Sequence, residues 1–256
     1  MKLQLGIVSA GVALATLGTS AAQAAFVVVP TDLAPGDQYR LVFVTAGTRD
    51  AQSLNIDDYN TFVTNQATGG TPGIDTALDT ALNGAGFDLS TITWKAIGST
   101  SAVDARDNTG TNPSSTGVPI YLIDGNRVAN NNADLWDGSL QHPINRNNLD
   151  EISSHNRIWT GSNETGQRTN LSGYAAYLGS DSTLGVRTGD RSLTDSGWIA
   201  RSSSLFFSSW GLYAMSSVLT VPVQPEPVTV PEPSSLLGYI TLGGLMLGGA
   251  VRKARK

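Results

Sequence analysis

The segment Gln38-Tyr39-Arg40-Leu41-Val42-Phe43-Val44-Thr45 decides the fold of this chain. Polar and apolar side chains alternate over part of it, and β-branched and aromatic residues are frequent. Both properties predict a β-strand. Two helical patterns follow this strand. Residues 50–64 place Leu54, Tyr59, Phe62 and Val63 at helical separations, which predicts an amphipathic helix.

Short polar residues and glycines mark the ends of the helical patterns. Ser53 or Asp50 is expected to cap the first helix, and Gly69 and Gly70 to end it. Residues 76–82 form a second, shorter helical candidate before a glycine-containing stretch. The chain therefore begins with one strand and two helices.

Short strand patterns separated by polar turns dominate the rest of the chain. The candidates are residues 92–97, 118–123, 157–160 and 212–221. Asp124-Gly125 is expected to form a primed hairpin turn. Early helices and late strands predict an α+β fold with short antiparallel strands, in one exported domain over residues 25–222.

The charge of this domain is acidic. The chain has 16 basic and 21 acidic side chains, and removing the terminal cations Lys2, Arg252, Lys253, Arg255 and Lys256 leaves 11 against 21. Nucleic-acid binding needs clustered cations to neutralise phosphates, and the remaining cations are dispersed. We expect no nucleic-acid partner.

Several kinds of catalytic and metal site are excluded by composition. The chain has no cysteine and only two histidines, His142 and His155. Thiolate nucleophiles, thiolate zinc sites and multi-histidine zinc sites are therefore impossible. Neither histidine lies in a recognisable nucleophile motif, and both are interpreted as polar loop residues.

Three consecutive segments in the C-terminal part of the sequence predict a sorting signal. A proline-rich linker over residues 223–233 ends in Pro231-Glu232-Pro233, an apolar run occupies residues 234–251, and a basic tail follows to Lys256. As a helix the 18-residue run would span about 27 Å, which predicts a marginal transmembrane helix. A buried core helix is the alternative, but the basic tail argues against it.

This order of parts resembles the PEP-CTERM sorting signal of Gram-negative bacteria. The resemblance implies export, inner-membrane anchoring through residues 234–256, processing by exosortase at Pro231, Glu232 and Pro233, and a final place on the cell surface or in the extracellular matrix. Residues 1–24 agree, because Lys2, an apolar segment and Ala22-Gln23-Ala24 predict a secretory signal peptide cleaved between Ala24 and Ala25 by signal peptidase of the export machinery. An N-terminal membrane anchor is the weaker alternative.

A second resemblance concerns the exported domain. The segments Val118–Leu122 with Asp124-Gly125, Leu135–Ser139, Arg157–Asn163 with Gly166 and Arg168, and Leu212–Met215 resemble, in this order, landmarks of endostatin-like domains. Such domains have a C-type-lectin-like fold, which the resemblance implies for roughly residues 92–221. The chain lacks their disulfides, the zinc site of endostatin and the calcium motifs of C-type lectins, so those activities do not carry over.

Two oxygen-rich segments are candidates for calcium. The weak metal candidates are Asp104, Asp107, Asp124, Asp134 and Asp137, with asparagines beside them. Calcium takes about six to eight oxygen ligands of this kind. The alternative is structural, because Asp and Asn favour turns by bonding their own backbone. Calcium is therefore a candidate cofactor and no cofactor is certain.

The tryptophans offer a candidate ligand site. An exposed aromatic face beside polar groups can orient a sugar ring, and Trp136 is the best placed of the five because an acidic, Asn-rich loop surrounds it. Two carboxylates about 5–10 Å apart could instead cleave a glycosidic bond. No pair of acids is favoured by its context, so we expect no enzyme.

The sequence therefore predicts an exported surface or matrix protein that acts as a non-enzymatic structural or binding module. The alternative is a lectin-like protein that binds exopolysaccharide, with or without calcium. A secreted glycoside hydrolase is the third hypothesis.

Overall fold

The strand predicted from residue 38 onward lies at the centre of the sheet. In the computed structural model, which describes residues 26–70 and 76–223, β1 spans Gln38–Val44. It pairs with β10 (Gly211–Ser216) antiparallel on one side and with β3 (Ile120–Leu122) parallel on the other. Side chains from β1 are buried on both faces, which explains why the run Leu41–Val44 is continuously apolar.

Nine strands form the main sheet. Its order is β4-β3-β1-β10-β5-β8-β9, with β11 paired to β1 and β2 paired to β10. The remaining bounds are β2 Trp94–Ala96, β4 Arg127–Ala129, β5 Arg157–Trp159, β6 Asn170–Leu171, β7 Tyr174–Ala175, β8 Val186–Asp190, β9 Ser202–Ser204 and β11 Leu219–Thr220. Strands β6 and β7 form a separate hairpin.

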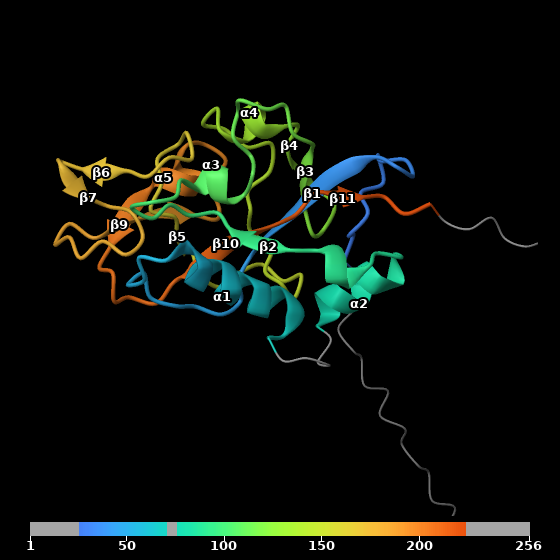
Figure 1. The fold of residues 1–256 in the computed structure, drawn as a ribbon, viewed down its shortest axis with the longest axis horizontal. Coiled ribbons are helices and arrows are strands. Elements are labelled where there is room, and N and C mark those ends of the chain that lie inside the picture. Colours follow the sequence, from blue (N-terminus) through green and yellow to red (C-terminus); the bar gives the residue numbers. More distant parts are fainter. Residues whose placement is uncertain (1–25, 71–75, 224–256) are drawn as a thin grey trace, which may run out of the picture. The chain divides into compact units, whose positions relative to one another are not determined.

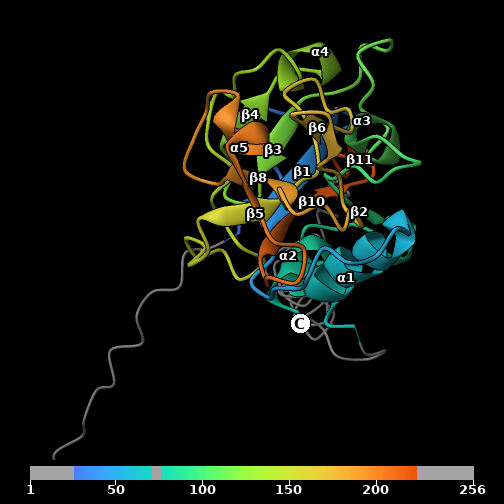
Figure 2. The same ribbon diagram turned by 90° about the vertical axis from the view of Figure 1, so that its left-hand side faces the viewer.

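Helices cover the two faces of the sheet unequally. The longer helices α1 (Ile56–Thr68) and α2 (Ala77–Gly84) lie on one face, with the short 3-10 helix η1 (Leu89–Thr91) after them. Three single-turn helices lie on the other face: α3 (Ala105–Asn108), α4 (Asn132–Leu135) and α5 (Gly197–Ala200). Figures 1 and 2 agree on this arrangement. The predicted α+β class is confirmed.

Helix α1 begins later than the sequence predicts. Its N-cap is Asn55, whose side chain accepts a 3.1 Å hydrogen bond from the amide of Asp57. The predicted caps Ser53 and Asp50 are wrong, because neither side chain accepts from an amide of the first turn: Asp50 accepts from the amide of Gln52, and Ser53 accepts from that of Asn55 and donates to the Asp58 carboxylate. The predicted end is confirmed, since Gly69 has a φ of 78° that glycine adopts without steric cost.

Helix α2 agrees well with its prediction. The side chain of Thr76 caps it by accepting a 3.1 Å hydrogen bond from the amide of Asp79. The strands predicted near residues 92–97 and 212–221 are shorter or interrupted, because β2 covers only Trp94–Ala96 and Ser217-Val218 separates β10 from β11.

Two details of strand pairing correct the sequence prediction. The strands are not all antiparallel, because β1 with β3 and β10 with β5 are parallel pairs. The turn after β3 is not primed either. Its only positive φ is that of Gly125, at 86°, and the Gly125 amide donates to the carbonyl of Leu122. This is a type I turn followed by a left-handed glycine, the usual three-residue hairpin loop.

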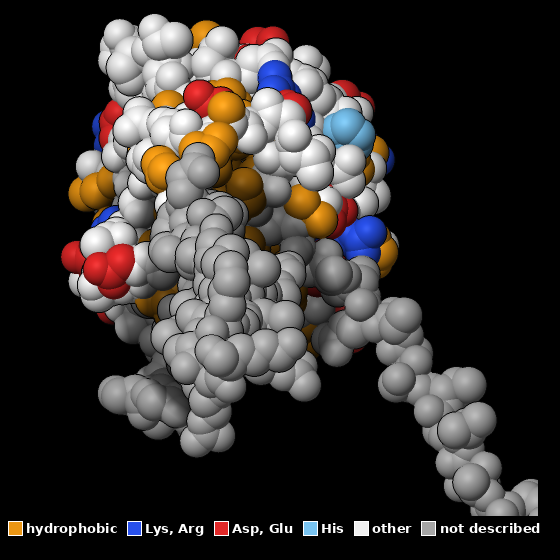
Figure 3. All heavy atoms as spheres, turned by 90° about the vertical axis from the view of Figure 1, so that its right-hand side faces the viewer, with side chains coloured by type: hydrophobic (Ala, Val, Ile, Leu, Met, Phe, Trp, Pro, Cys, Tyr) orange, Lys and Arg blue, Asp and Glu red, His pale blue; other side chains and the backbone are white. Residues whose placement is uncertain are grey.

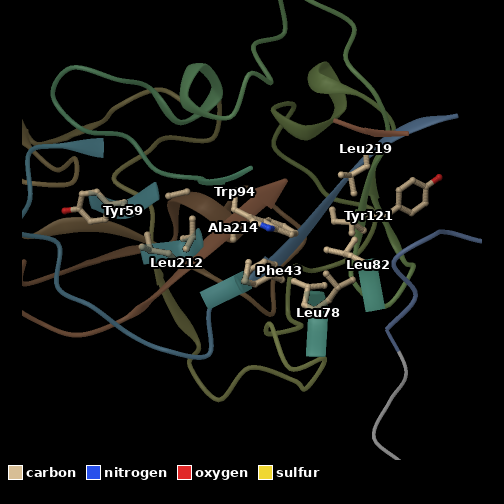
Figure 4. Packing of buried hydrophobic residues seen from close by; sticks show 14 of the residues in the cluster. Phe43, Tyr59, Leu78, Leu82, Trp94, Tyr121, Leu212, Ala214 and Leu219 are labelled. Carbon is tan, nitrogen blue, oxygen red and sulfur yellow. The ribbon is translucent and has the colours of Figure 1, made fainter. Parts of the chain in front are cut away.

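Two hydrophobic cores lie on opposite sides of the sheet. The helix-side core packs β1 residues such as Phe43 against α1 and α2, including Leu78 and Leu82 (Figure 4). The loop-side core packs Val42 and Val44 against the short helices, including Trp198 of α5. Each fully buried Leu or Phe contributes about 1.5–3 kcal/mol by leaving water, so both cores hold the sheet.

Several predicted segments lie outside the described residues. They are the signal peptide with Ala24 and Ala25, nearly all of the linker, Pro231, Glu232 and Pro233, and the apolar helix with its basic tail. Within residues 26–70 and 76–223, no helix has the length and apolarity needed to cross a membrane. Residues 26–222 pack as one unit.

Candidate functional site: a groove between α1 and β2

The acidic side chains predicted as calcium ligands are engaged in local hydrogen bonds. A carboxylate oxygen of Asp104, the residue before α3, accepts from the backbone amide of Arg168 at 2.9 Å. Within α3, Asp107 accepts from the side-chain amide of Asn112 at 2.7 Å. Both aspartates therefore brace neighbouring loops.

The second group of acids is engaged in the same way. Asp124 forms an ion pair with Arg146 at 2.9 Å. Asp134 accepts from the amide of Asn130 at 2.6 Å, and Asp137 accepts from the amide of Ser139 at 2.9 Å. These are turn and cap bonds of the kind that Asp favours.

The five acids do not come together as one site. Among residues 26–70 and 76–223, no group of three or more Asp, Glu, His or Cys side chains is placed to hold a metal. Calcium at these positions stays a prediction. At Asp104, Asp107, Asp134 and Asp137 one carboxylate oxygen accepts these bonds, and a cation would have to use the other oxygen.

Trp136 lies in the loop-side core instead of on the surface. Its side chain is only 4% exposed, and its indole nitrogen donates to the carbonyl of Thr111 at 3.0 Å. The centroid of the Trp136 ring is 5.7 Å from that of Trp198, and Gly166 lies close to the six-membered ring of the indole. Stacking on a sugar requires an exposed aromatic face, which Trp136 does not offer here.

The structure instead offers a groove along one side of α1. It has a volume of about 420 Å³, within the range of about 300–1,000 Å³ typical of small-molecule sites. One wall is formed by α1 and the other by the chain entering and forming β2. The lining residues are Asp57, Asn60, Thr61, Thr64, Asn65, Ile92, Thr93, Trp94 and Lys95.

Side chains of α1 hold the two walls together by bonding the free edge of β2. Asn60 accepts a 2.9 Å hydrogen bond from the amide of Ala96, and Thr64 donates to the carbonyl of Trp94 at 3.2 Å. Asn108 of α3 completes this joint by donating to the carbonyl of Ala96 at 2.7 Å. The groove therefore has a rigid floor, because the backbone groups of an exposed strand edge are satisfied.

Other lining groups have no partner in the protein. Within the described part of the chain, the side chains of Thr61, Asn65 and Lys95 form no hydrogen bond or ion pair. Asp57 contacts only Asn60 of its own helix, at 3.4 Å. The α1 wall thus offers a hydroxyl, an amide and a carboxylate group to a ligand, and the β2 wall offers an ammonium group.

A second unusual site lies beside the ion pair of Asp124 and Arg146. Asp150 is 3% exposed, and neither carboxylate oxygen has a hydrogen-bond partner. Burial raises the pKa of Asp150 to about 6, although Arg146 nearby partly opposes the shift. The residue also has a φ of 58°, which only Gly, Asn and Asp adopt readily. This carboxyl group destabilises the fold at neutral pH.

Charges elsewhere are dispersed. On the face drawn in Figure 3, acidic and basic side chains lie singly among neutral ones. The described residues contain three ion pairs, made by Arg49, Arg127 and Arg146. Asp32 has a lowered pKa because, although partial burial opposes the shift, hydrogen bonds from Tyr121 and Arg127 together outweigh it.

Sequence reasoning missed the groove because its walls are far apart in the chain. Thr64 and Trp94, which touch across it, are 30 residues apart. One signal was present: Lys95 is the single lysine between Lys2 and Lys253. This lone lysine, on a predicted strand, is the feature of the sequence that points to the groove.

Comparison with known proteins adds no assignment. The chain matches no protein-family model and no curated protein.

Proposed function

We propose that this chain is an exported surface or matrix protein whose body is a non-enzymatic module that binds a saccharide in the groove between α1 and β2. The observation that carries the proposal is the groove itself, because its volume suits a small ligand and its lining includes the unpaired hydroxyl, amide and ammonium groups of Thr61, Asn65 and Lys95. Saccharides present many hydroxyl groups, which such side chains recognise by hydrogen bonding.

Binding is favoured over hydrolysis by the lining. A glycosidase uses two carboxyl groups about 5–10 Å apart. Asp57 is the one carboxylate among the residues that line this groove. We therefore propose a binding site without catalysis.

The proposed fold is C-type-lectin-like. Support comes from the order of elements, since two helices follow β1 directly and β11 returns to pair with β1 at residues 38 and 39. Three of the segments that resemble endostatin-like domains fall on β3, β10 and β5 of one sheet, where β10 and β5 are neighbours and β1 separates β3 from β10. The calcium dependence of the binding stays a separate proposal.

The proposed route to the cell surface rests on the two ends of the sequence. Signal peptidase would cleave between Ala24 and Ala25, residues 234–251 would anchor the chain in the inner membrane, and exosortase would process it at Pro231, Glu232 and Pro233. Mass spectrometry of the protein from cells tests this. A tail intact to Lys256 in the exported fraction contradicts processing.

The binding proposal is tested by retention of full-length protein on the producer's immobilised exopolysaccharide. We expect saturable binding that Asn65→Ala weakens at least about threefold, a loss of about 0.6 kcal/mol, because a neutral hydrogen bond is lost. Asn156→Ala is the matched control, since this exposed asparagine also has a free side chain but lies outside the groove. No retention, or equal losses in both variants, contradicts the groove.

The second candidate is a structural module without a discrete ligand. Exposed apolar side chains at separate surface positions, such as Phe207 in a turn and Tyr174 on β7 at 60% each, favour it because they can contact other matrix components. This candidate predicts incorporation into the matrix with no saturable saccharide binding. The retention experiment separates the two.

A further inference from the structure

The charge of Lys95 stands out in the groove. It is the single lysine of residues 26–223, and it is partly buried on the short strand β2. No carboxylate of the described residues lies within ion-pair distance of it, and it is the one cation among the residues that line the groove. In a body with an excess of acidic side chains, this cation is unneutralised beside a cavity.

The wall formed by α1 differs in chemistry from the wall that carries Lys95. Thr61 and Asn65 project from the exposed side of α1, and Asp57 lies about two turns before Asn65. The hydroxyl, amide and carboxylate groups of α1 can form hydrogen bonds with the hydroxyls of a sugar ring. The negative charge of Asp57 disfavours a ligand carboxylate at the α1 wall, whereas the β2 wall offers the single positive charge of Lys95.

We propose that the groove is selective for an acidic saccharide, with the ligand's carboxylate held by Lys95 and its hydroxyls held by α1. This inference rests on the saccharide-binding function proposed above and names the class of sugar. A lysine ammonium is a compact charge with three donors, which suits a single carboxylate. A polyphosphate backbone fits poorly, because it would need several cations in a row.

The test compares a charged ligand with its neutral counterpart. Full-length protein in detergent is titrated calorimetrically with oligomannuronate, and with the same oligomer after chemical reduction of its carboxyl groups. We expect the uronate to bind about tenfold more tightly, the ratio that one charge-assisted hydrogen bond of ordinary strength gives. The preference should shrink as salt is raised, since the site is partly open to solvent.

Substitutions of Lys95 then test whether this residue binds the ligand's carboxylate. Lys95→Gln should abolish the preference for the uronate while leaving affinity for the reduced oligomer within about twofold, and Lys95→Arg should keep most of the preference. Arg157→Gln is the control, because Arg157 is an exposed cation of β5 that contacts the Trp210 ring, outside the groove.

Three outcomes overturn the inference, and they can be told apart. Equal affinity for both oligomers in the wild type shows a neutral site, which leaves saccharide binding intact but refutes the acidic class. Loss of the preference in Arg157→Gln instead of Lys95→Gln places the anion elsewhere. No binding of either oligomer, together with no retention on exopolysaccharide, refutes the proposed function and this inference with it. The comparison of oligomers uses the wild type, so it holds even if Lys95→Gln fails to fold.

Discussion

The groove between α1 and β2 and the loop face around α3 and α4 use the same kinds of polar side chain in opposite ways. On the loop face, residues such as Asp104 and Asp134 accept hydrogen bonds from nearby backbone amides. In the groove, the side chains of Thr61, Asn65 and Lys95 form no hydrogen bond or ion pair within the described chain. In this chain, segments dense in acidic residues therefore form turns. The groove, whose polar side chains have no local partner, is the better candidate for a binding site.

The difference has a structural cause. An irregular chain leaves many backbone amides without helix or sheet partners, and Asp and Asn supply the missing acceptors. A helix satisfies its own interior backbone, so polar side chains on its exposed side keep their hydrogen-bonding capacity. Four predictions test this comparison, beginning with the largest expected effect.

The loop face depends on a packed core as much as the helix face does. Trp198 of α5 is fully buried and contacts Trp136 and Tyr213. Trp198→Ala should lower the free energy of unfolding by about 3–5 kcal/mol in urea denaturation, because it leaves a large cavity. Phe207→Ala, at an exposed aromatic, should change it by less than about 0.5 kcal/mol. A loss below about 1 kcal/mol for Trp198→Ala would show that the loop face is loosely packed.

Asp150 is an exception among the loop acids, because its carboxyl group has no hydrogen-bond partner. The folded state raises its pKa from 3.8 to about 6, so it binds the proton more tightly than the unfolded chain does. Stability from this group is complete below about pH 4 and is lost as the pH rises through about 6.

Asp150→Asn should therefore stabilise the protein at pH 7 by about 1–2 kcal/mol, since the charge is removed and Asn tolerates the left-handed backbone. The gain should vanish below about pH 4, as measured by urea denaturation over a pH series. Asp58→Asn, at an exposed acid on α1, is the control. A gain that does not depend on pH would point to a cause other than the charge of Asp150.

A pair of alanine variants should separate stability from binding. Asp134→Ala removes the acceptor for Asn130 and Gln141 and should cost about 1 kcal/mol while leaving saccharide affinity unchanged. Asn65→Ala should change stability by less than about 0.5 kcal/mol while weakening saccharide binding. Thermal denaturation and calorimetric titration measure the two quantities. Weaker binding in Asp134→Ala would move the site to the loop face.

The smallest expected effect concerns calcium. Because the five candidate acids are not grouped around one point in the described residues, exchanging calcium for a chelator should shift the melting temperature by less than about 2 °C, which corresponds to less than about 1 kcal/mol for a domain of this size. Differential scanning fluorimetry measures the shift. A saturable increase that Asp134→Ala abolishes would establish a calcium site there.

Local features of the fold could be predicted from the sequence. The run Leu41–Val44 predicts β1 because a buried central strand needs apolar side chains on both faces. Gly69 ends α1 because the last turn needs a left-handed residue. Thr76 caps α2 because its hydroxyl reaches the amide of Asp79. Each of these properties depends on neighbours in the chain.

Features that depend on distant contacts could not be predicted in this way. The parallel pairing of β1 with β3 joins segments about 80 residues apart, and the groove requires α1 to meet the edge of β2. Loop composition also predicts that Trp136 is exposed, whereas it is buried. Its burial follows from how the loops fold back on the sheet, which no local pattern encodes.

The most direct test of the saccharide-binding groove is an NMR titration of residues 26–222 with oligomannuronate, following backbone amide shifts. We predict saturable shifts concentrated at Asp57, Thr61, Asn65, Thr93 and Lys95, the groove residues. Shifts concentrated at residues 104–139, or no saturable shifts at all, would contradict the account.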